Sequence, residues 1–232
     1  MSDVAYTGSG TSVPAGDKLW APAPLVEGSL GIFKGVGNGL LALDLLGSAQ
    51  LLPTDQISNL TVDSTARQIG GIALGLGYGA RIGLLGERGP LPAVSVSVMR
   101  RDIPRITYGD VSTADRYSYG VDLHATNLRL VASKNLLFLD MAAGLGWDKY
   151  TGDAVIRFRD PITNIAQPDV PVKLNSSRVL GFLNAGMNLS VVRLTGEVGY
   201  QGGKDQNLST DFQDFDTTKG KFFAGLGLRV GF

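Results

Sequence analysis

Hydrophobic and polar residues alternate along most of this chain, in segments about as long as a β-strand. Side chains of an extended strand point to opposite faces in turn, so each segment predicts one apolar and one polar face. In residues 136–149, Leu145 and Trp147 share one parity and Asp140 and Asp148 share the other. The pattern predicts strands over residues 25–34, 40–52, 68–84, 92–101, 116–132, 136–149, 177–189, 191–202 and 222–232.

The alternation changes phase once, inside the segment 116–132. From Tyr117 to Leu123 the apolar residues occupy odd-numbered positions, whereas Leu128 and Leu130 occupy even-numbered positions. A β-bulge inserts one extra residue and so restores the faces of a strand. We therefore predict a bulge at residues 125–127, which would return Arg129 to the polar face.

The predicted strands are joined by short and long connections in turn. Short ones follow Lys34, Leu84, Ala132 and Leu189, with a tight turn at residues 133–135. Long polar ones span about 53–67, 102–115, 150–176 and 203–219. This layout, with one end of short turns and one end of long loops, is typical of transmembrane β-barrels.

The last strand carries the most specific pattern in the chain. From Phe222 to the final residue, Phe232, one parity is entirely apolar and the other is mostly glycine, with Arg229 among it. The segment resembles the terminal strand of bacterial outer-membrane β-barrel proteins, which is read by the barrel-assembly machinery. Gly227, Val230 and Phe232 match the glycine, hydrophobic and terminal aromatic positions, and Gly225 departs from the expected polar residue. The resemblance implies an integral protein of the bacterial outer membrane, in contact with its lipids and with that machinery.

The composition limits the alternatives. No stretch approaches the eighteen or so apolar residues that a membrane helix needs. The chain has 32 glycines, no cysteine and a formal net charge of zero. The absence of cysteine excludes disulfides and thiol chemistry, and the charge gives no reason to expect nucleic acid as a partner.

We accordingly expect one all-β domain over residues 1–232, an antiparallel up-and-down transmembrane β-barrel of about 8–10 strands. Nine strands can be counted, and single-chain bacterial barrels usually have an even number. Ten strands are favoured, with residues 3–7 within an N-terminal loop or partial strand at 1–24 as the end of a truncated first strand. Eight strands are the alternative. No signal peptide is visible, so we expect either the mature, exported form or a truncated fragment of the gene, and we expect a monomer.

The polar parity collects charges of both signs, which would line the barrel lumen. They are Glu27, Asp44, Arg81, Arg101, Asp122, His124, Arg129, Asp140, Asp148, Arg178, Arg193, Glu197, Lys221 and Arg229. In a narrow lumen such groups must pair or stay hydrated. One interpretation is a salt-bridged plug, and the other is a small aqueous path with an electrostatic filter. The plug is favoured, because small barrels have little interior room.

Aromatic residues of the apolar parity suggest an interfacial girdle. Tyr119, Trp147, Tyr200 and Phe222 would lie near the long-loop end, and Phe232 at the opposite rim. His124 is the only histidine, and a lipid-modifying enzyme would need a nucleophile within its hydrogen-bond reach. We expect no enzyme, no cofactor and no metal. Aspartates 205, 211, 214 and 216 are best explained as a solvated loop rather than a calcium site.

The leading functional hypothesis is therefore a structural barrel or narrow channel. A second is the binding or passage of small hydrophobic molecules, which would require an unfilled pocket lined by Phe33, Phe138 and Phe182. A soluble β-sandwich is the remaining alternative.

Overall fold

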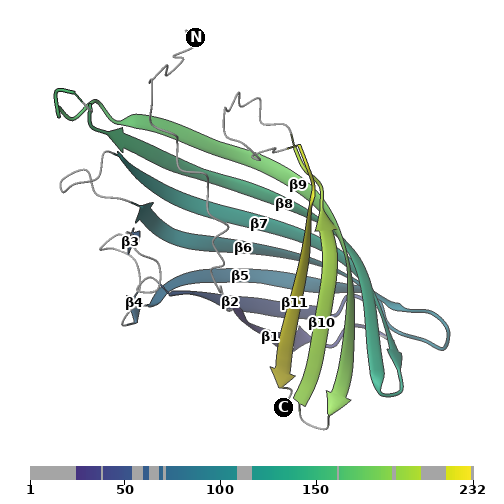
Figure 1. The fold of residues 1–232 in the computed structure, drawn as a ribbon. Coiled ribbons are helices and arrows are strands. Elements are labelled where there is room, and N and C mark those ends of the chain that lie inside the picture. Colours follow the sequence, from purple (N-terminus) through teal and green to yellow (C-terminus); the bar gives the residue numbers. More distant parts are fainter. Residues whose placement is uncertain are drawn as a thin grey trace.

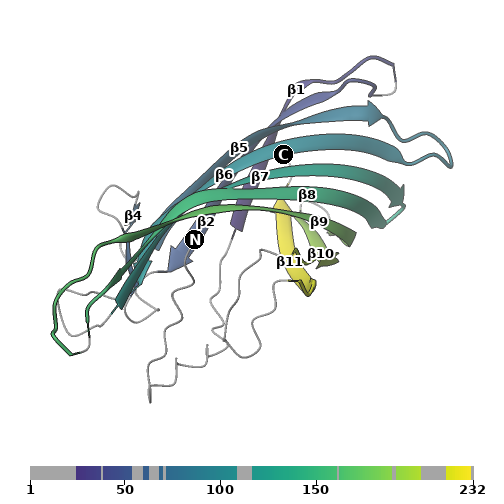
Figure 2. The same cartoon turned by 90° about the horizontal axis from the view of Figure 1, so that it is seen from above.

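The computed structural model consists of one curled antiparallel sheet (Figures 1 and 2). It describes residues 25–37, 39–53, 60–62, 68–69, 72–108, 117–160, 162–189, 192–204 and 218–230. The strands are β1 (Leu25–Phe33), β2 (Leu43–Pro53), β3 (Leu60–Val62), β4 (Gln68–Ile69), β5 (Ile72–Leu85), β6 (Ala93–Tyr108), β7 (Tyr117–Leu136), β8 (Leu139–Phe158), β9 (Val170–Leu189), β10 (Val192–Gln201) and β11 (Lys221–Val230).

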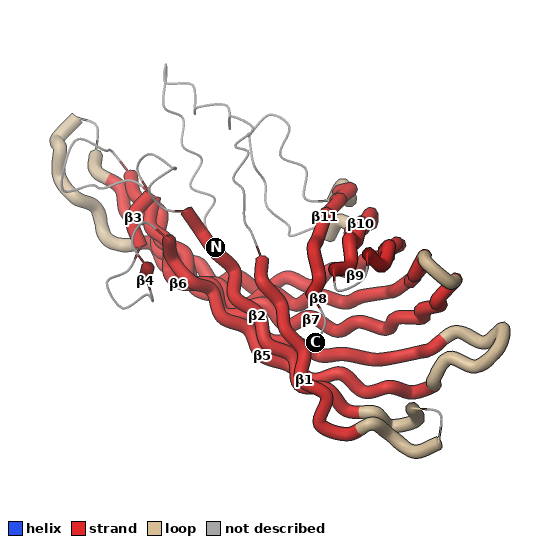
Figure 3. The backbone as a smooth tube through the Cα atoms, turned by 90° about the horizontal axis from the view of Figure 1, so that it is seen from below, coloured by secondary structure: helices blue, strands red, loops and turns tan. Residues whose placement is uncertain are grey.

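The main path of the sheet follows chain order. It runs β1-β2-β5-β6-β7-β8-β9-β10-β11, while the short β3 and β4 pair with β6 and β5. Nine antiparallel up-and-down strands therefore form a half-barrel, which confirms the all-β class and the up-and-down order. The described strands form a single sheet rather than the two packed sheets of a sandwich (Figure 3).

Short and long connections alternate as the sequence predicts, although three boundaries were wrong. The predicted long loop at 102–115 begins later, because β6 continues to Tyr108. The hairpin between β7 and β8 turns at Leu137 and Phe138, not at residues 133–135, because Asn135 still pairs with Asp140 in the sheet. Leu137 takes a positive φ of 58°, a conformation that its sequence does not signal. The predicted long loop at 150–176 is mostly strand, since β8 continues to Phe158 and β9 begins at Val170.

The predicted bulge in β7 is absent. Ala125, Thr126 and Asn127 pair in unbroken register with Tyr150, Lys149 and Asp148 of β8. A register shift occurs instead in the neighbouring strand β6, between Ile103 and Ile106. Pro104 lies in that interval and cannot donate to the ladder, and prolines inside sheets are confined to edges and bulges.

The two faces of the sheet can be assigned from contacts that skip strands. Arg101 of β6 forms an ion pair with Glu27 of β1, and β2 and β5 lie between these two strands. Side chains of such distant strands meet only across the concave side of a curled sheet. The register then gives the face of every residue, because neighbours along a strand alternate.

The half-barrel has little conventional apolar core. Among the described residues the buried hydrophobic ones are Ala73, Met99, Ala125, Ala154 and Leu180. Many large hydrophobic side chains are exposed instead. The fold is therefore not held together by burial of many large apolar side chains, and its most buried ion pair, Arg129–Asp148, lies on the concave face.

Candidate functional site

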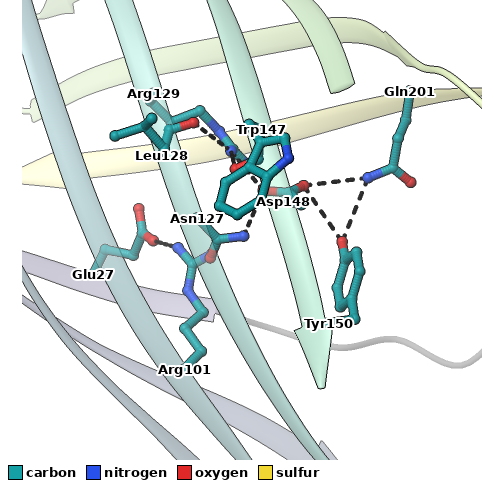
Figure 4. A network of polar contacts seen from close by, with 9 residues as sticks. All are labelled: Glu27, Arg101, Asn127, Leu128, Arg129, Trp147, Asp148, Tyr150 and Gln201. Atoms are coloured by element: carbon teal, nitrogen blue, oxygen red, sulfur yellow. Dashed lines mark hydrogen bonds and ion pairs between the residues drawn. The ribbon is translucent and has the colours of Figure 1, made fainter. Parts of the chain in front are cut away.

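The candidate site is a network of polar side chains on the concave face (Figure 4). Arg101 donates to Asn127 Oδ1 at 2.7 Å and pairs with Glu27. Asn127 in turn donates to Asp148 Oδ1 at 2.6 Å. Arg129 pairs with the same oxygen at 2.6 Å. The network therefore links β1, β6, β7 and β8 across the inside of the curl.

Asp148 is the centre of this network, with only 3% of its side chain exposed. Its second oxygen accepts from Gln201 Nε2 at 3.2 Å and lies 3.4 Å from the Tyr150 hydroxyl. Gln201 belongs to β10, so the contacts also cross β9. Burial of a carboxylate is costly unless it is paired and hydrogen-bonded, and Asp148 is both.

Further ion pairs occupy the same face. Asp44 pairs with Arg81 at 2.7 Å, and Asp140 with Arg193 at 3.0 Å. By register, Arg178, Glu197, Lys221 and Arg229 also take concave positions. The side chain of Arg229 lies outside the described set. Arg129 reaches the concave face in a regular strand, without the bulge that the sequence analysis introduced.

The opposite, convex face carries a band of exposed apolar side chains, which we call the convex belt. It consists of Val26, Leu30, Leu45, Tyr78, Ile82, Val98, Leu128, Leu130, Met141, Leu145, Trp147, Val179, Leu183, Met187, Leu194, Val198, Tyr200, Phe222 and Leu226. Leu226 is 89% exposed. Monomeric soluble proteins rarely leave a contiguous apolar patch larger than a few hundred Å² uncovered. The belt therefore needs an apolar environment.

The convex belt is inclined to the rows of paired residues. In the register, its upper limit moves by about six residues from Phe222 in β11 to Val26 in β1, eight strands away. With a rise of about 3.3 Å per residue and about 4.8 Å between strands, this is an inclination of about 27°. The belt thus crosses the strands obliquely, at an angle below the tilt of about 35–45° that transmembrane barrel strands have. The belt members span seven residues of β8, from Met141 to Trp147, and nine of β9, from Val179 to Met187, close to the 9–11 residues of a membrane-spanning strand.

Three of the predicted girdle aromatics lie at the upper limit of the belt. Trp147, Tyr200 and Phe222 are on the convex face, and the rings of Tyr200 and Phe222 are 4.9 Å apart. Tyr119 was placed wrongly, because its backbone position is concave and lies far above Leu128 in β7. Phe232 lies outside the described residues. Tyr78 belongs to the same group and was not included in the prediction.

Above the belt, the polarity of the sheet is reversed. β7, β8 and β9 are each 20 residues long and continue beyond the belt, together with the end of β6. In this extension the concave positions carry Ile103, Val121, Leu123, Ala154, Val172 and Leu174, all buried or half-buried. The convex positions carry Asp102, Asp122, His124, Thr151, Asp153 and Lys173. The change of apolar parity within residues 116–132 therefore results from this reversal of polarity and not from a bulge.

Asp122 and His124 are therefore on the convex face, not in a lumen. His124 Nδ1 lies 2.8 Å from Asp102 Oδ1, and Nε2 lies 3.9 Å from Asp122 Oδ1. Asp102 also accepts from Arg100. Among the described contacts of His124 there is no hydroxyl or thiol that could serve as a nucleophile.

The three phenylalanines of the hypothetical apolar pocket do not come together. Phe138 is in the β7–β8 turn, and Phe33 pairs with Leu43 at a convex position after a shift in β1. Phe182 lies on the concave face, where its ring covers Gly144. Phe223 covers Gly199 in the same way. These glycines make room for aromatic rings on neighbouring strands, an arrangement that stabilises glycine-containing sheets.

Within the described residues, no group of histidine and carboxylate side chains is arranged to hold a metal ion. The aspartates at 205–216 lie outside those residues. No helix in the described part of the chain is long and apolar enough to cross a membrane. No model of a known protein family matches the chain. A search among curated proteins finds no significant relative.

Proposed function

We propose that this chain is an integral β-barrel protein of a bacterial outer membrane, with a narrow lumen obstructed by ion pairs. Its role would be structural or that of a restricted small-solute channel, and not enzymatic. The observation that carries the proposal is the convex belt: the sheet is apolar on its outer face and polar on its inner face, and the belt crosses the strands obliquely. The resemblance of residues 222–232 to a terminal barrel strand agrees with it.

Closure of the barrel would require one further strand. β1 and β11 both run towards the short-turn end, because β1 leads into a short connection and β11 follows a long one. Two parallel edges can be joined with antiparallel pairing only through a strand that runs the opposite way. The expected first strand within residues 1–24 would have this direction, although it lies outside the described residues.

The obstructed lumen follows from the network around Asp148. Side chains of β1, β6, β7, β8 and β10 are linked across the concave face at the upper limit of the belt. Paired groups in a small lumen leave no wide water column. We expect a conductance in planar bilayers far below that of a general porin, with little passage of sugars. Large, stable, porin-like conductance would overturn this part of the proposal.

The membrane assignment is tested by charges on the two faces. Leu226→Lys and Leu194→Lys would each cost about 2–4 kcal/mol of folding free energy in liposomes, because both would place an ammonium in the hydrocarbon region. Thr195→Lys is the matched control, since Thr195 is concave and donates to Gly227 O. Equal tolerance of all three substitutions would refute the assigned faces.

A second candidate is the binding of small hydrophobic molecules. It is favoured by the apolar concave face of the extension, formed by Leu123, Val172, Leu174 and their neighbours. Quenching of an apolar fluorescent probe would test it, with Leu123→Asn and Leu174→Asn as the weakening variants and Leu145→Asn on the belt as control. Unchanged probe affinity in both extension variants would exclude this site.

A further inference from the structure

We propose that a row of cations and hydroxyls directly above the convex belt binds the phosphate groups of membrane lipids. The row consists of Arg100, Thr126, Lys149, Ser177 and Lys204. This inference rests on the proposed membrane location and adds to it a lipid headgroup as partner.

The sheet register brings these residues into line. Arg100 pairs with Thr126, Thr126 with Lys149, and Lys149 with Ser177. Lys204, which follows β10, extends the row because its Nζ lies 3.2 Å from Ser177 Oγ. Cations and hydroxyls thus alternate from strand to strand. Since neighbouring strands are about 4.8 Å apart, the Cα atoms of successive cations are separated by roughly 10 Å.

From β6 to β9 the upper limit of the belt follows one register row, and the cations and hydroxyls lie in the next convex row above it, where headgroups would be. The next convex residues towards the short-turn end are apolar: Val98, Leu128, Trp147 and Val179. Tryptophan is enriched where hydrocarbon gives way to headgroups. Cationic side chains placed just beyond it can extend into the phosphate region, and each lysine or arginine near an anionic membrane surface adds to binding.

The cations of the row are accessible. Arg100, Lys149 and Lys204 are all exposed. Arg100 donates through Nε to Asp102 at 3.2 Å, and both side chains of this pair are 46% exposed. Such a pair contributes little, and the guanidinium has further donors for a phosphate. Asp102 is one register step higher, so its charge lies on the side away from the belt.

The hydroxyls make phosphate a better fit than a general anion. Thr126 and Ser177 stand between the cations and can each donate one hydrogen bond. A phosphate offers several acceptor oxygens and can bridge a cation and its neighbouring hydroxyl. Farther up the same face, Asp122 and Asp153 are directly paired, which makes that region less suitable for an anion.

Trp147 gives the experiment a local reporter. The sequence has two tryptophans, and Trp20→Phe would leave Trp147 alone, in the row of belt residues below the cations. The full-length Trp20→Phe protein is folded into vesicles of unlabelled phosphatidylcholine. Quenching of Trp147 is then compared for brominated phosphatidic acid and brominated phosphatidylcholine, which gives their relative association at this site.

We expect at least a fivefold preference for phosphatidic acid, on the order expected for one or more cations near the surface. Arg100→Gln, Lys149→Gln and Lys204→Gln together would abolish it. Lys173→Gln is the single-charge control on the same convex face, to be compared with Lys149→Gln alone. Lys149→Gln should reduce the preference severalfold, whereas Lys173→Gln should leave it unchanged.

Three outcomes would overturn the inference: equal quenching by both lipids, an equal effect of Lys173→Gln and Lys149→Gln, or loss of the preference when millimolar inorganic phosphate is added at constant ionic strength. The last result would indicate a site for free phosphate. Failure of the membrane proposal is distinguishable, because neither brominated lipid would then quench Trp147.

Discussion

Replacement of Asp148 provides the most direct test of the concave network. Asp148→Ala removes the acceptor of Arg129, Asn127 and Gln201, and Asp148 itself is almost fully buried. Arg129 would then keep a charge without its carboxylate, in a place where only 23% of its side chain is exposed. Breaking a buried pair from one side costs about 3–5 kcal/mol, and we expect a loss of this size.

Equilibrium urea unfolding in liposomes, followed by tryptophan fluorescence, would measure the change. Asp148→Asn keeps the shape and one acceptor, so its loss should be smaller, about 1–3 kcal/mol. Arg129→Ala in addition to Asp148→Ala should cost less than the sum of the two, because the unpaired charge is gone. Asp153→Ala, at an exposed convex position, should stay within about 0.5 kcal/mol of the unmodified protein. If Asp148→Ala resembled Asp153→Ala, the network would not stabilise the fold.

Three further predictions concern other parts of the chain. Lys134 and the Asn135 backbone N–H lower the pKa of Glu87 by hydrogen bonding to its carboxylate. This contact therefore stabilises the short-turn end at pH values above the ordinary glutamate pKa, and the stabilisation is lost as the pH falls through the lowered pKa. An NMR titration of the Glu87 carboxyl should show the lowered pKa, and Lys134→Gln should reverse most of the shift. Gly199→Val should destabilise the sheet by about 1–3 kcal/mol in the same urea assay, since a Cβ there would meet the Phe223 ring, and an unchanged midpoint would contradict the packing. Deletion of Phe232 should reduce outer-membrane levels in cells more than refolding into detergent, and normal levels would argue against its role as an assembly signal.

The strands were predictable from the sequence where each face of the strand keeps the same environment along its whole length. β1, β2, β5 and β10 keep one apolar and one polar face over almost their whole length, so simple alternation located them and, apart from the shift at Phe33, their faces. The sequence analysis assigned the faces of β7 wrongly, because Leu123 lies on the apolar concave face of the extension and Leu128 lies on the convex belt. A local pattern cannot distinguish a reversal of environment from an inserted residue, and only pairing with β8 separates them.

The site was predictable as a set of charges but not as a set of contacts. The parity of Asp148, Arg129 and Arg101 follows from the alternation, yet their contacts depend on the register and curl of the sheet. Asn127 and Gln201 complete the network and were missed as site residues, since neutral polar residues on the concave face gave no separate signal. His124 was assigned to the wrong face for the same reason as Leu123.

The two parallel edges of the half-barrel set a condition on how such a protein can enter a bilayer. In the described sheet, β1 and β11 each have one side without a neighbouring strand. At membrane depth, roughly every second residue of such an edge would present one N–H and one C=O to hydrocarbon, and each unsatisfied group costs several kcal/mol. A few residues on each edge would exceed the 5–15 kcal/mol that typically separates folded from unfolded protein. A nine-stranded sheet with two unpaired edges is therefore not stable in the hydrocarbon region. Either insertion and edge pairing occur as one event, or a strand of another protein has to pair with the edges until they meet.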